Sequence, residues 1–180
     1  MLDKNVLLEG PRVRLRPVEV ADVGQRYHDW MNDPEVNRYM ETRFRRQTRE
    51  DIRAHVEKMK AAADVLFWAM VDRASSRHIG NIKLGPISEI HRRGELSFFI
   101  GEKEFWGRGL TTEVVALVTE YALKTLGLHK VAAGCYSNNQ GSIRVFEKVG
   151  YTRVATLPEH YLCEGRFVDR LCFEKLGVAP

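Results

Sequence analysis

The sequence has no apolar run long enough to cross a bilayer. Its longest apolar stretches are short, such as VLFWAMV at residues 65–71, whereas a membrane-spanning helix needs about 20 apolar residues. The first ten residues, MLDKNVLLEG, also lack the long apolar segment of a signal peptide. We therefore expect a cytoplasmic protein with no membrane partner.

Cysteine and histidine are too few and too scattered to form a disulfide framework or a metal site. The three cysteines are an odd number, and no pair has the close spacing of metal ligands. The histidines show no ligand spacing either. We expect reduced thiols and no bound metal, and the residues considered are Cys135, Cys163, Cys172, His78, His91, His129 and His160.

The chain also lacks repeats, low-complexity tracts and a linker rich in Pro, Gly or Ser. Its 180 residues are expected to form one domain, residues 1–180, with a substantial core. The net charge of +4 is well short of a nucleic-acid-binding tail, so no nucleic-acid partner is expected. Basic residues do gather at residues 43–49 (RFRRQTR), as either a solvated face or an electropositive patch for an acidic or phosphorylated ligand.

Apolar periodicity predicts a mixed α/β order. Period-2 or short apolar runs favour strands, and apolar residues at spacings of three and four favour helices. Thr48, followed three residues later by Asp51, is a plausible helix N-cap. The predicted order is a strand (12–18), two helices (20–34, 48–62), three strands (66–72, 78–87, 94–101), a helix (110–126), a strand (129–136), a helix (139–150) and two strands (151–157, 166–176).

Between a predicted strand and a predicted helix lies EFWGRG, residues 104–109. Glycines let an anion approach the backbone, and a helix N-terminus offers unpaired N–H groups and a positive dipole, which suits a pyrophosphate. A tight turn without a ligand is the alternative. Two known phosphate loops do not fit, because the dinucleotide fingerprint fails at Thr112 and the P-loop spacing fails between Gly101 and Gly107.

EFWGRG resembles the acyl-CoA loop of the GNAT N-acetyltransferase superfamily, with Glu104 in place of its Gln or Arg. NQGSIRVFEKVGY, residues 139–151, resembles a later element of the same superfamily, one crossover strand downstream. RLRPVEVADV, the WMNDP segment and FWGRGLTTE are similar to the branch of ribosomal-protein N-terminal acetyltransferases (RimJ/RimL type) and spermidine acetyltransferases. The resemblance implies a GNAT fold, with a mostly antiparallel twisted sheet of about six to seven strands, flanking helices and one splayed parallel strand pair.

The resemblance also implies acetyl transfer from acetyl-CoA to a primary amine, and a homodimer. The acceptor stays open between a protein N-terminus, an amino-sugar nucleotide and a polyamine. VNRYMETRF and HIGNIKLGPI are similar to members that acetylate amino-sugar nucleotides. A polyamine would favour an acidic channel, and the basic segment 43–49 argues mildly against that. A domain that binds acyl-CoA without catalysis is the remaining alternative.

The resemblance implies three kinds of contact with acetyl-CoA. A main-chain N–H of residues 99–101 would bind the thioester oxygen, amides of residues 106–112 would bind the pyrophosphate, and Asn139 would bind the pantetheine arm. Arg108 would contact a phosphate, with solvation as the alternative. The expected cofactor-binding residues are Phe99, Ile100, Gly101, Trp106, Gly107, Arg108, Gly109, Leu110, Thr111, Thr112, Asn139, Ser142 and Phe146.

For catalysis, the resemblance implies Glu95 as the base that deprotonates the amine. The alternative is a surface glutamate paired with Arg92 or Arg93. The family's tyrosine that protonates the leaving thiolate is replaced by Phe146, so the thiolate receives its proton from Tyr136, Ser142 or water, or leaves unassisted. Ser142 is alternatively a helix cap.

By the same resemblance, Trp30, Arg43 and Tyr161 are expected to face the amine acceptor.

Overall fold

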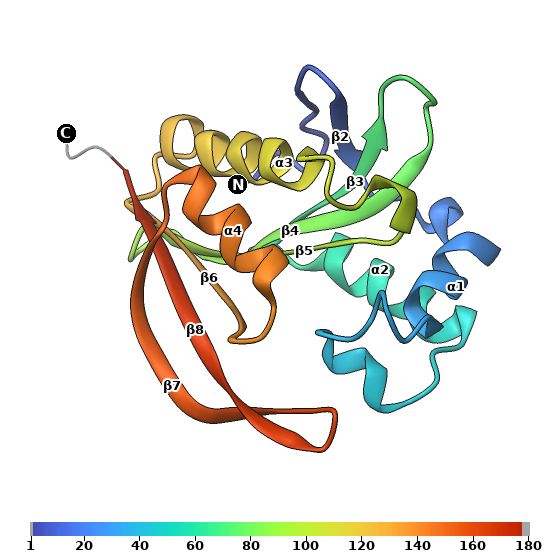
Figure 1. Cartoon of the computed structure of the whole chain (residues 1–180). Coiled ribbons are helices and arrows are strands. Elements are labelled where there is room, and N and C mark those ends of the chain that lie inside the picture. The colour runs from blue at the N-terminus through green and yellow to red at the C-terminus, as the bar shows by residue number, and fades with distance from the viewer. Residues whose placement is uncertain (1, 178–180) are drawn as a thin grey trace.

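The computed structural model describes residues 2–177, which form one eight-stranded sheet in the order β1-β2-β3-β4-β5-β6-β8-β7 (Figure 1). All neighbouring strands pair antiparallel except β5 and β6, which are parallel. The strands are β1 (Leu8–Glu9), β2 (Val13–Pro17), β3 (Leu66–Asp72), β4 (His78–Ser88), β5 (Arg93–Ile100), β6 (Lys130–Tyr136), β7 (Thr152–Cys163) and β8 (Arg166–Leu176). The mixed α/β fold is confirmed, but with one strand more than predicted, because the two-residue β1 is too short to show a period.

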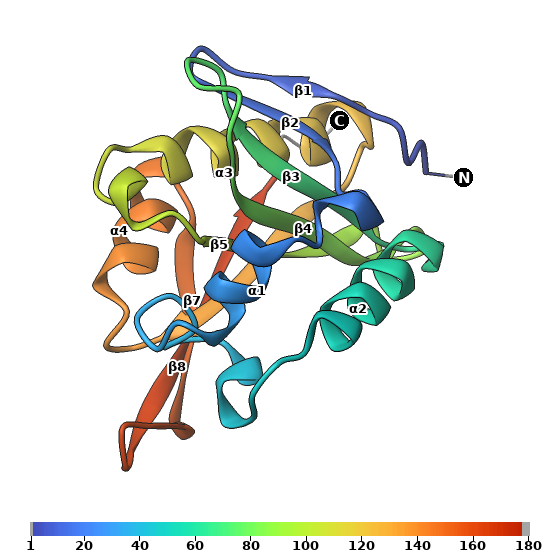
Figure 2. The same cartoon turned by 90° about the vertical axis from the view of Figure 1, so that its right-hand side faces the viewer.

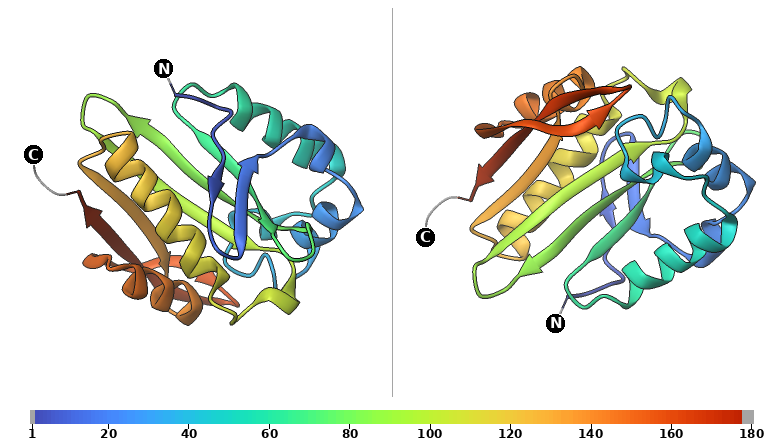
Figure 3. Two further views of the ribbon diagram at one scale, coloured as in Figure 1. Left: turned by 90° about the horizontal axis from the view of Figure 1, so that it is seen from above. Right: turned by 90° about the horizontal axis from the view of Figure 1, so that it is seen from below.

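Helices cover both faces of the sheet. Figure 2 shows α1 and α2 in front of the strands, and the left view of Figure 3 shows α3 and α4 across the opposite face. The helices are α1 (Gln25–Asn32), α2 (Arg49–Ala61), α3 (Leu110–Glu120) and α4 (Gln140–Val149), with short 3-10 turns η1 (Val20–Asp22), η2 (Glu41–Phe44) and η3 (Lys103–Phe105) and a π turn, η4 (Tyr121–Thr125), that continues α3.

Each face has its own hydrophobic core, because strand side chains alternate between the two faces. Along β5, Leu96 and Phe98 pack with the α3–α4 core, whereas Phe99 packs with the α1–α2 core. On the α3–α4 side the predicted inward residue Phe146 is 2% exposed. The sheet therefore separates two layers, and a ligand that passes between two strands would meet both.

The start of α2 follows its sequence signal. Thr48 Oγ1 accepts a hydrogen bond from Asp51 N at 3.1 Å, and Asp51 Oδ2 accepts one from Thr48 N at 3.0 Å. These two bonds form a capping box, which satisfies two of the free N–H groups at the helix start. The predicted N-cap at Thr48 is confirmed.

The parallel strands β5 and β6 pair only at one end. Their register runs from Arg93 opposite Lys130 to Leu96 opposite Ala133 and then stops. β5 continues to pair with β4 as far as Ile100, and β6 continues to pair with β8 as far as Tyr136. The two strands therefore separate beyond Leu96, as predicted, and residues 97–100 face a gap in the sheet.

Candidate active site

A cavity of about 1250 Å³ lies at the gap between β5 and β6. One side is lined by the glycine loop and α4, on the α3–α4 face of the sheet. The other is lined by α1, η2 and α2, on the opposite face. We call these parts the donor arm and the acceptor arm. Lining residues that the argument uses are Tyr27, Glu41, Asn81, Tyr136, Ser142 and Tyr161.

The glycine loop leaves the backbone of the donor arm open. Gly107 and Gly109 have φ angles of 72° and 77°, a left-handed conformation that residues with a Cβ atom adopt only with strain. Gly109 is the N-cap of α3, and no side chain caps the first turn. The N–H groups of Leu110, Thr111 and Thr112 therefore stay available to an anion, in addition to the helix dipole.

Glu113, in the same first turn of α3, is directed away from the loop. Its carboxylate accepts hydrogen bonds from the backbone N–H of Arg12 at 2.8 Å and of Val13 at 3.0 Å. The Arg12 guanidinium also donates to the Arg108 carbonyl at 2.8 Å. Arg12 therefore fixes the loop from outside the donor arm and neutralises a carboxylate that would otherwise repel an anion.

Alternation along β5 decides which main-chain N–H groups face the gap. Gly101 N donates to Ile79 O at 2.9 Å, so its N–H points toward β4. Because successive residues of a strand point their N–H groups to opposite sides, Phe98 and Ile100 direct theirs to the gap. The Ile100 carbonyl, on the same side, accepts from Trp106 Nε1 at 2.9 Å. Of residues 99–101, where a donor is expected, Ile100 directs its N–H to the gap, whereas Phe99 and Gly101 direct theirs to β4. Phe98, just outside that range, also faces the gap.

At the start of α4, Asn139 is the helix cap and Ser142 is not. Asn139 Oδ1 accepts from Ser142 N at 3.1 Å, which places Ser142 in the third helical position. Both residues line the cavity. The Ser142 hydroxyl is thus not needed for capping.

Phe146, one turn further along α4, packs with Phe98 and Phe173 at ring-centroid distances of 5.7 and 5.1 Å. Its ring gives the donor arm an apolar wall. No proton can come from this position.

Tyr136 lies at the open end of β6, where both arms meet. Its hydroxyl donates to Glu41 Oε1 at 2.8 Å and accepts from Arg43 Nη1 at 2.8 Å. Its ring stacks on Tyr161 at 4.0 Å between centroids. Burial and the nearby Glu41 carboxylate raise the pKa of Tyr136 to about 12, so the phenol keeps its proton at neutral pH.

Comparison with known proteins identifies the family of this chain. The profile of the acetyltransferase (GNAT) domain matches residues 12–152. The chain belongs to the GNAT acetyltransferase family. It is therefore an acyltransferase, and relatives with similar sequences are named N-acetyltransferases.

One protein of similar sequence and two solved structures of similar fold compare with this GNAT chain as follows. The human protein named alpha/beta-tubulin-N-acetyltransferase 9 is 32% identical over 166 residues, which cover 86% of this chain and 79% of the human one. Spermidine N-acetyltransferase from Vibrio cholerae, solved with CoA and spermine, has a TM-score of 0.82 at 22% identity, covering 93% of this chain and 96% of that one. RimL, the ribosomal L7/L12 alpha-N-protein acetyltransferase solved with coenzyme A, has a TM-score of 0.84 at 13% identity, covering 97% and 100%. At these identities the two solved structures show the fold alone.

Glu95, the expected base of this GNAT domain, lies outside the cavity lining. It is exposed on the acceptor face of β5, and Arg170 Nη2 donates to its Oε1 at 3.3 Å. The alternative reading, a surface glutamate in an ion pair, therefore describes its environment, although the partner differs from the predicted ones. Arg92 instead donates to the Gly127 carbonyl.

Of the three residues expected to face the acceptor, Trp30 lies elsewhere. It is 5% exposed in the α1–α2 core, its Nε1 donates to Glu102 Oε1 at 3.1 Å, and its ring presses against Gly101. Arg43 links two segments of the chain, since it donates to the Tyr136 hydroxyl and also to the Leu162 carbonyl at 2.6 Å. Tyr161 does line the cavity.

The basic segment 43–49 does not form one patch. Arg43 is engaged as described, Arg45 pairs with Asp51 at 3.4 Å, and Arg46 lines a separate shallow depression near α1. The electropositive patch considered from the sequence is therefore divided among several sites.

The inner wall of the acceptor arm was not predicted from the sequence. Tyr27 had the periodicity of an ordinary core residue, and Asn81 was one polar position inside an apolar strand. A buried asparagine in such a strand is a signal, because it requires hydrogen-bond partners. Asn81 is 1% exposed, and its Nδ2 donates to the Tyr27 hydroxyl at 2.7 Å.

Among residues 2–177, no group of three or more His, Cys, Asp or Glu side chains has the arrangement of a metal site. Within the same residues, no helix is both long and apolar enough to span a membrane.

Proposed function

We propose that the protein is an acetyl-CoA-dependent N-acetyltransferase whose acceptor is the α-amine of a peptide or protein. The observation that carries this proposal is the state of the carboxylates around the cavity. Glu35 pairs with Lys103, Glu41 accepts from Tyr136, Asp51 caps α2, and Glu164 pairs with Arg38 at 2.8 Å. Every carboxylate of the lining thus already has a partner within the chain.

The engaged carboxylates argue against a polyamine. A polyamine carries several positive charges and would need unpaired carboxylates along its path. They also bear on deprotonation, because no lining carboxylate is free to act as a base. An α-amine has a pKa of about 8, against about 10.4 for an alkyl amine such as lysine, so a useful fraction is neutral near pH 7 without a strong base.

The donor arm fits acetyl-CoA. The open amides at Leu110, Thr111 and Thr112 suit its pyrophosphate, Arg108 at the loop surface suits a phosphate, and the gap between β5 and β6 suits its extended arm. Bound there, acetyl-CoA supplies an activated acetyl group. The N–H groups of Phe98 and Ile100 point into the gap, where one of them can stabilise developing charge on the carbonyl oxygen.

Tyr136 is the first candidate to protonate the leaving thiolate. Its raised pKa keeps the phenol protonated, its hydrogen would have to turn from Glu41 to the thiolate, and Arg43 would stabilise the phenolate that forms. Ser142 lines the donor arm, and its hydroxyl is a second candidate. Glu95 is the weakest member of the expected catalytic set, because it lies outside the cavity and is paired with Arg170.

The names of two relatives support a protein acceptor. The human relative is named for α/β-tubulin, and RimL is named for the N-terminal acetylation of ribosomal L7/L12. One of the similar solved structures is a spermidine N-acetyltransferase, so a polyamine is the competing acceptor to test.

A second candidate, an amino-sugar nucleotide, is favoured by Lys83. This residue lines the acceptor arm from β4, and within residues 2–177 no carboxylate pairs with it. An unpaired ammonium suits a phosphate group.

The test measures thiol release from acetyl-CoA with three acceptors: a peptide with a free N-terminus, spermidine and a UDP-amino sugar. We expect release with the peptide, and no release with the same peptide blocked at its N-terminus. Release only with spermidine or only with the UDP-amino sugar would overturn the peptide assignment. Acetyl-CoA binding without release with any acceptor would favour the non-catalytic binding domain.

A further inference from the structure

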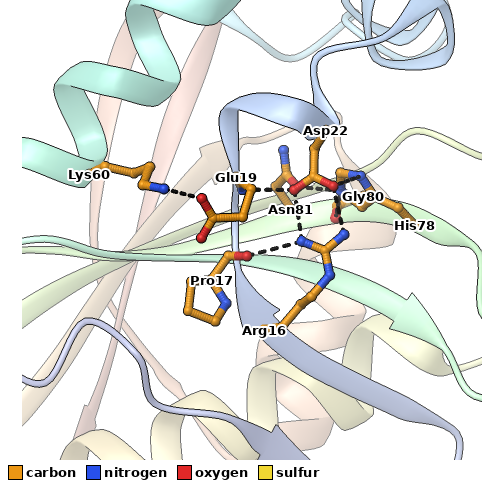
Figure 4. A network of polar contacts seen from close by, with 8 residues as sticks. All are labelled: Arg16, Pro17, Glu19, Asp22, Lys60, His78, Gly80 and Asn81. Carbon is orange, nitrogen blue, oxygen red and sulfur yellow. Dashed lines mark hydrogen bonds and ion pairs between the residues drawn. The ribbon is translucent and has the colours of Figure 1, made fainter.

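A chain of polar contacts runs through the protein behind the acceptor arm. Arg16 forms two bonds with Asp22, at 2.8 and 2.6 Å, and Asp22 Oδ1 lies 4.0 Å from His78 Nδ1 (Figure 4). His78 Nε2 lies 2.7 Å from Asn81 Oδ1 and 3.0 Å from the Gly80 carbonyl oxygen. Asn81 Nδ2 then reaches the Tyr27 hydroxyl, which lies on the inner wall of the cavity.

The direction of these hydrogen bonds is fixed by the Gly80 carbonyl. A carbonyl oxygen only accepts, so His78 Nε2 must carry a hydrogen. The Asn81 atom that faces this N–H must then be the acceptor Oδ1. The other end of the same amide, Nδ2, therefore faces Tyr27 and donates to its oxygen. Protonation of His78 changes nothing in this order, because Nε2 is a donor in both charge states.

Tyr27 is thereby left with a hydrogen to donate. Its oxygen accepts from Asn81, and within residues 2–177 no side-chain or backbone acceptor takes the hydroxyl hydrogen. Tyr27 is 3% exposed, and its ring packs in the apolar α1–α2 core, with Trp30 at 5.6 Å and Phe99 at 6.2 Å between centroids. Burial raises the pKa of Tyr27 well above its usual value, so the hydroxyl is a donor throughout the physiological pH range.

A buried donor without an acceptor is costly. Tyr27 and Asn81 both line the cavity, so a ligand in that cavity is the available acceptor. Both side chains belong to the α1–α2 face, away from the glycine loop, and hence to the acceptor arm. The bonds from His78 and Asn81 all point toward Tyr27, and such a chain strengthens the last donor in it.

We propose that Tyr27 donates a hydrogen bond to the first carbonyl oxygen of the acceptor, with His78 and Asn81 as positioning residues. The inference rests on the proposed function, because an α-amine in a peptide has a carbonyl oxygen close to the reacting nitrogen. A neutral hydroxyl suits a neutral amide oxygen, and one fixed donor there would place the amine at the gap. Polyamines have no such oxygen.

The test compares two acceptors: a methionine-initiated peptide and the same peptide with the first carbonyl reduced to a methylene, which removes the oxygen and turns the amide nitrogen into a basic amine. The readout is therefore the ratio of variant to wild-type kcat/KM for each acceptor. Tyr27→Phe should lower kcat/KM for the carbonyl form by about 10-fold, within the range for an unpaired buried polar group. It should leave the methylene form unchanged. Because both acceptors are measured with one variant, a general loss of folding cannot imitate this result.

Two further variants separate hydrogen-bond direction from packing. In Asn81→Asp, residue 81 has only acceptor atoms, so Tyr27 would donate its hydrogen to residue 81 and not to the ligand. The loss of kcat/KM in this variant should equal that in Tyr27→Phe, and the double variant should show no further loss. Tyr151→Phe is the matched control, since Tyr151 is also buried, shares a 2.7 Å bond with Thr119 and lies in the α3–α4 core. It should keep wild-type discrimination.

The outcomes also separate the two proposals. If Tyr27→Phe weakens both acceptors equally, or weakens neither, the inference about Tyr27 is overturned and the proposed function stands. If wild type acetylates neither, the proposed function fails and the inference fails with it.

Discussion

Gly101 at the end of β5 should be intolerant of even one extra methyl group. A Cβ atom built there would lie 2.1 Å from Trp30 Cδ2 and 2.4 Å from Trp30 Cγ, whereas carbon atoms in contact are about 3.5 to 4.0 Å apart. The ring cannot withdraw easily, because its Nε1 is bonded to Glu102 and it packs on His78 at 5.1 Å. Gly101→Ala therefore forces the ring or the strand end to move.

Overpacking of a core costs about 1–3 kcal/mol, and we expect Gly101→Ala at the upper end of that range. In a chain of this size each kcal/mol lowers Tm by about 2–4 °C, so Tm should fall by about 6–12 °C. Urea unfolding gives the free energy, and an unchanged slope would show that the change lies in stability.

Gly134 in β6 provides the matched control. A Cβ atom there would also be close to another group, 2.7 Å from Arg170 Nε. That group, however, belongs to a long side chain that is 29% exposed and can shift, rather than to a buried ring. Gly134→Ala should therefore cost less than Gly101→Ala, about 1 kcal/mol. A Gly101→Ala variant as stable as wild type, or a Gly134→Ala variant that is equally damaging, would refute the reasoning.

Three other predictions concern the loop, pH and α2. A Cβ atom at Gly107 would meet no atom within 4 Å, so Gly107→Ala should cost only the strain of a left-handed residue, about 1–2 kcal/mol. The same variant should raise KM for acetyl-CoA, which steady-state kinetics would measure. The pKa of Tyr136 in the folded state is raised from 10.0 to about 12, so its contribution to stability is complete below pH 10 and is lost as pH rises to 12. Urea titrations at increasing pH should show this fall in the free energy of unfolding, and the fall should be smaller in Tyr136→Phe. Thr48→Ala removes half of the capping box at α2 and should lower the free energy of unfolding by about 1 kcal/mol, whereas Ser142→Ala, which removes no cap, should leave it nearly unchanged.

Local patterns predicted the parts of the fold that depend on local physics. The capping box at Thr48 and Asp51, the glycine loop and the apolar face of α4 each involve residues within a few positions of one another. The splayed strand pair was also predicted, from the resemblance in residues 104–109 and 139–151.

Long-range side-chain partners were not predicted. Glu95 pairs with Arg170, 75 positions away, and Arg43 bonds to Tyr136, 93 positions away. No periodicity in a single sequence encodes such pairs. Trp30 was misjudged for a related reason: an aromatic residue on an amphipathic helix is compatible with a buried core or a ligand wall, and only the close approach of Gly101 decides between them.

The outer wall of the acceptor arm joins two distant parts of the chain. η2 and the residues before it are tied to the tip of the β7–β8 hairpin by Arg38 with Glu164 and by Arg43 with the Leu162 carbonyl. The donor arm, by contrast, comes from one continuous stretch, residues 96–148. The acceptor arm can therefore change in evolution while the donor arm stays constant, provided that the two tied segments change together. An engineered chimera should exchange residues 36–47 and 158–165 as a pair, because replacing one alone would break the ties.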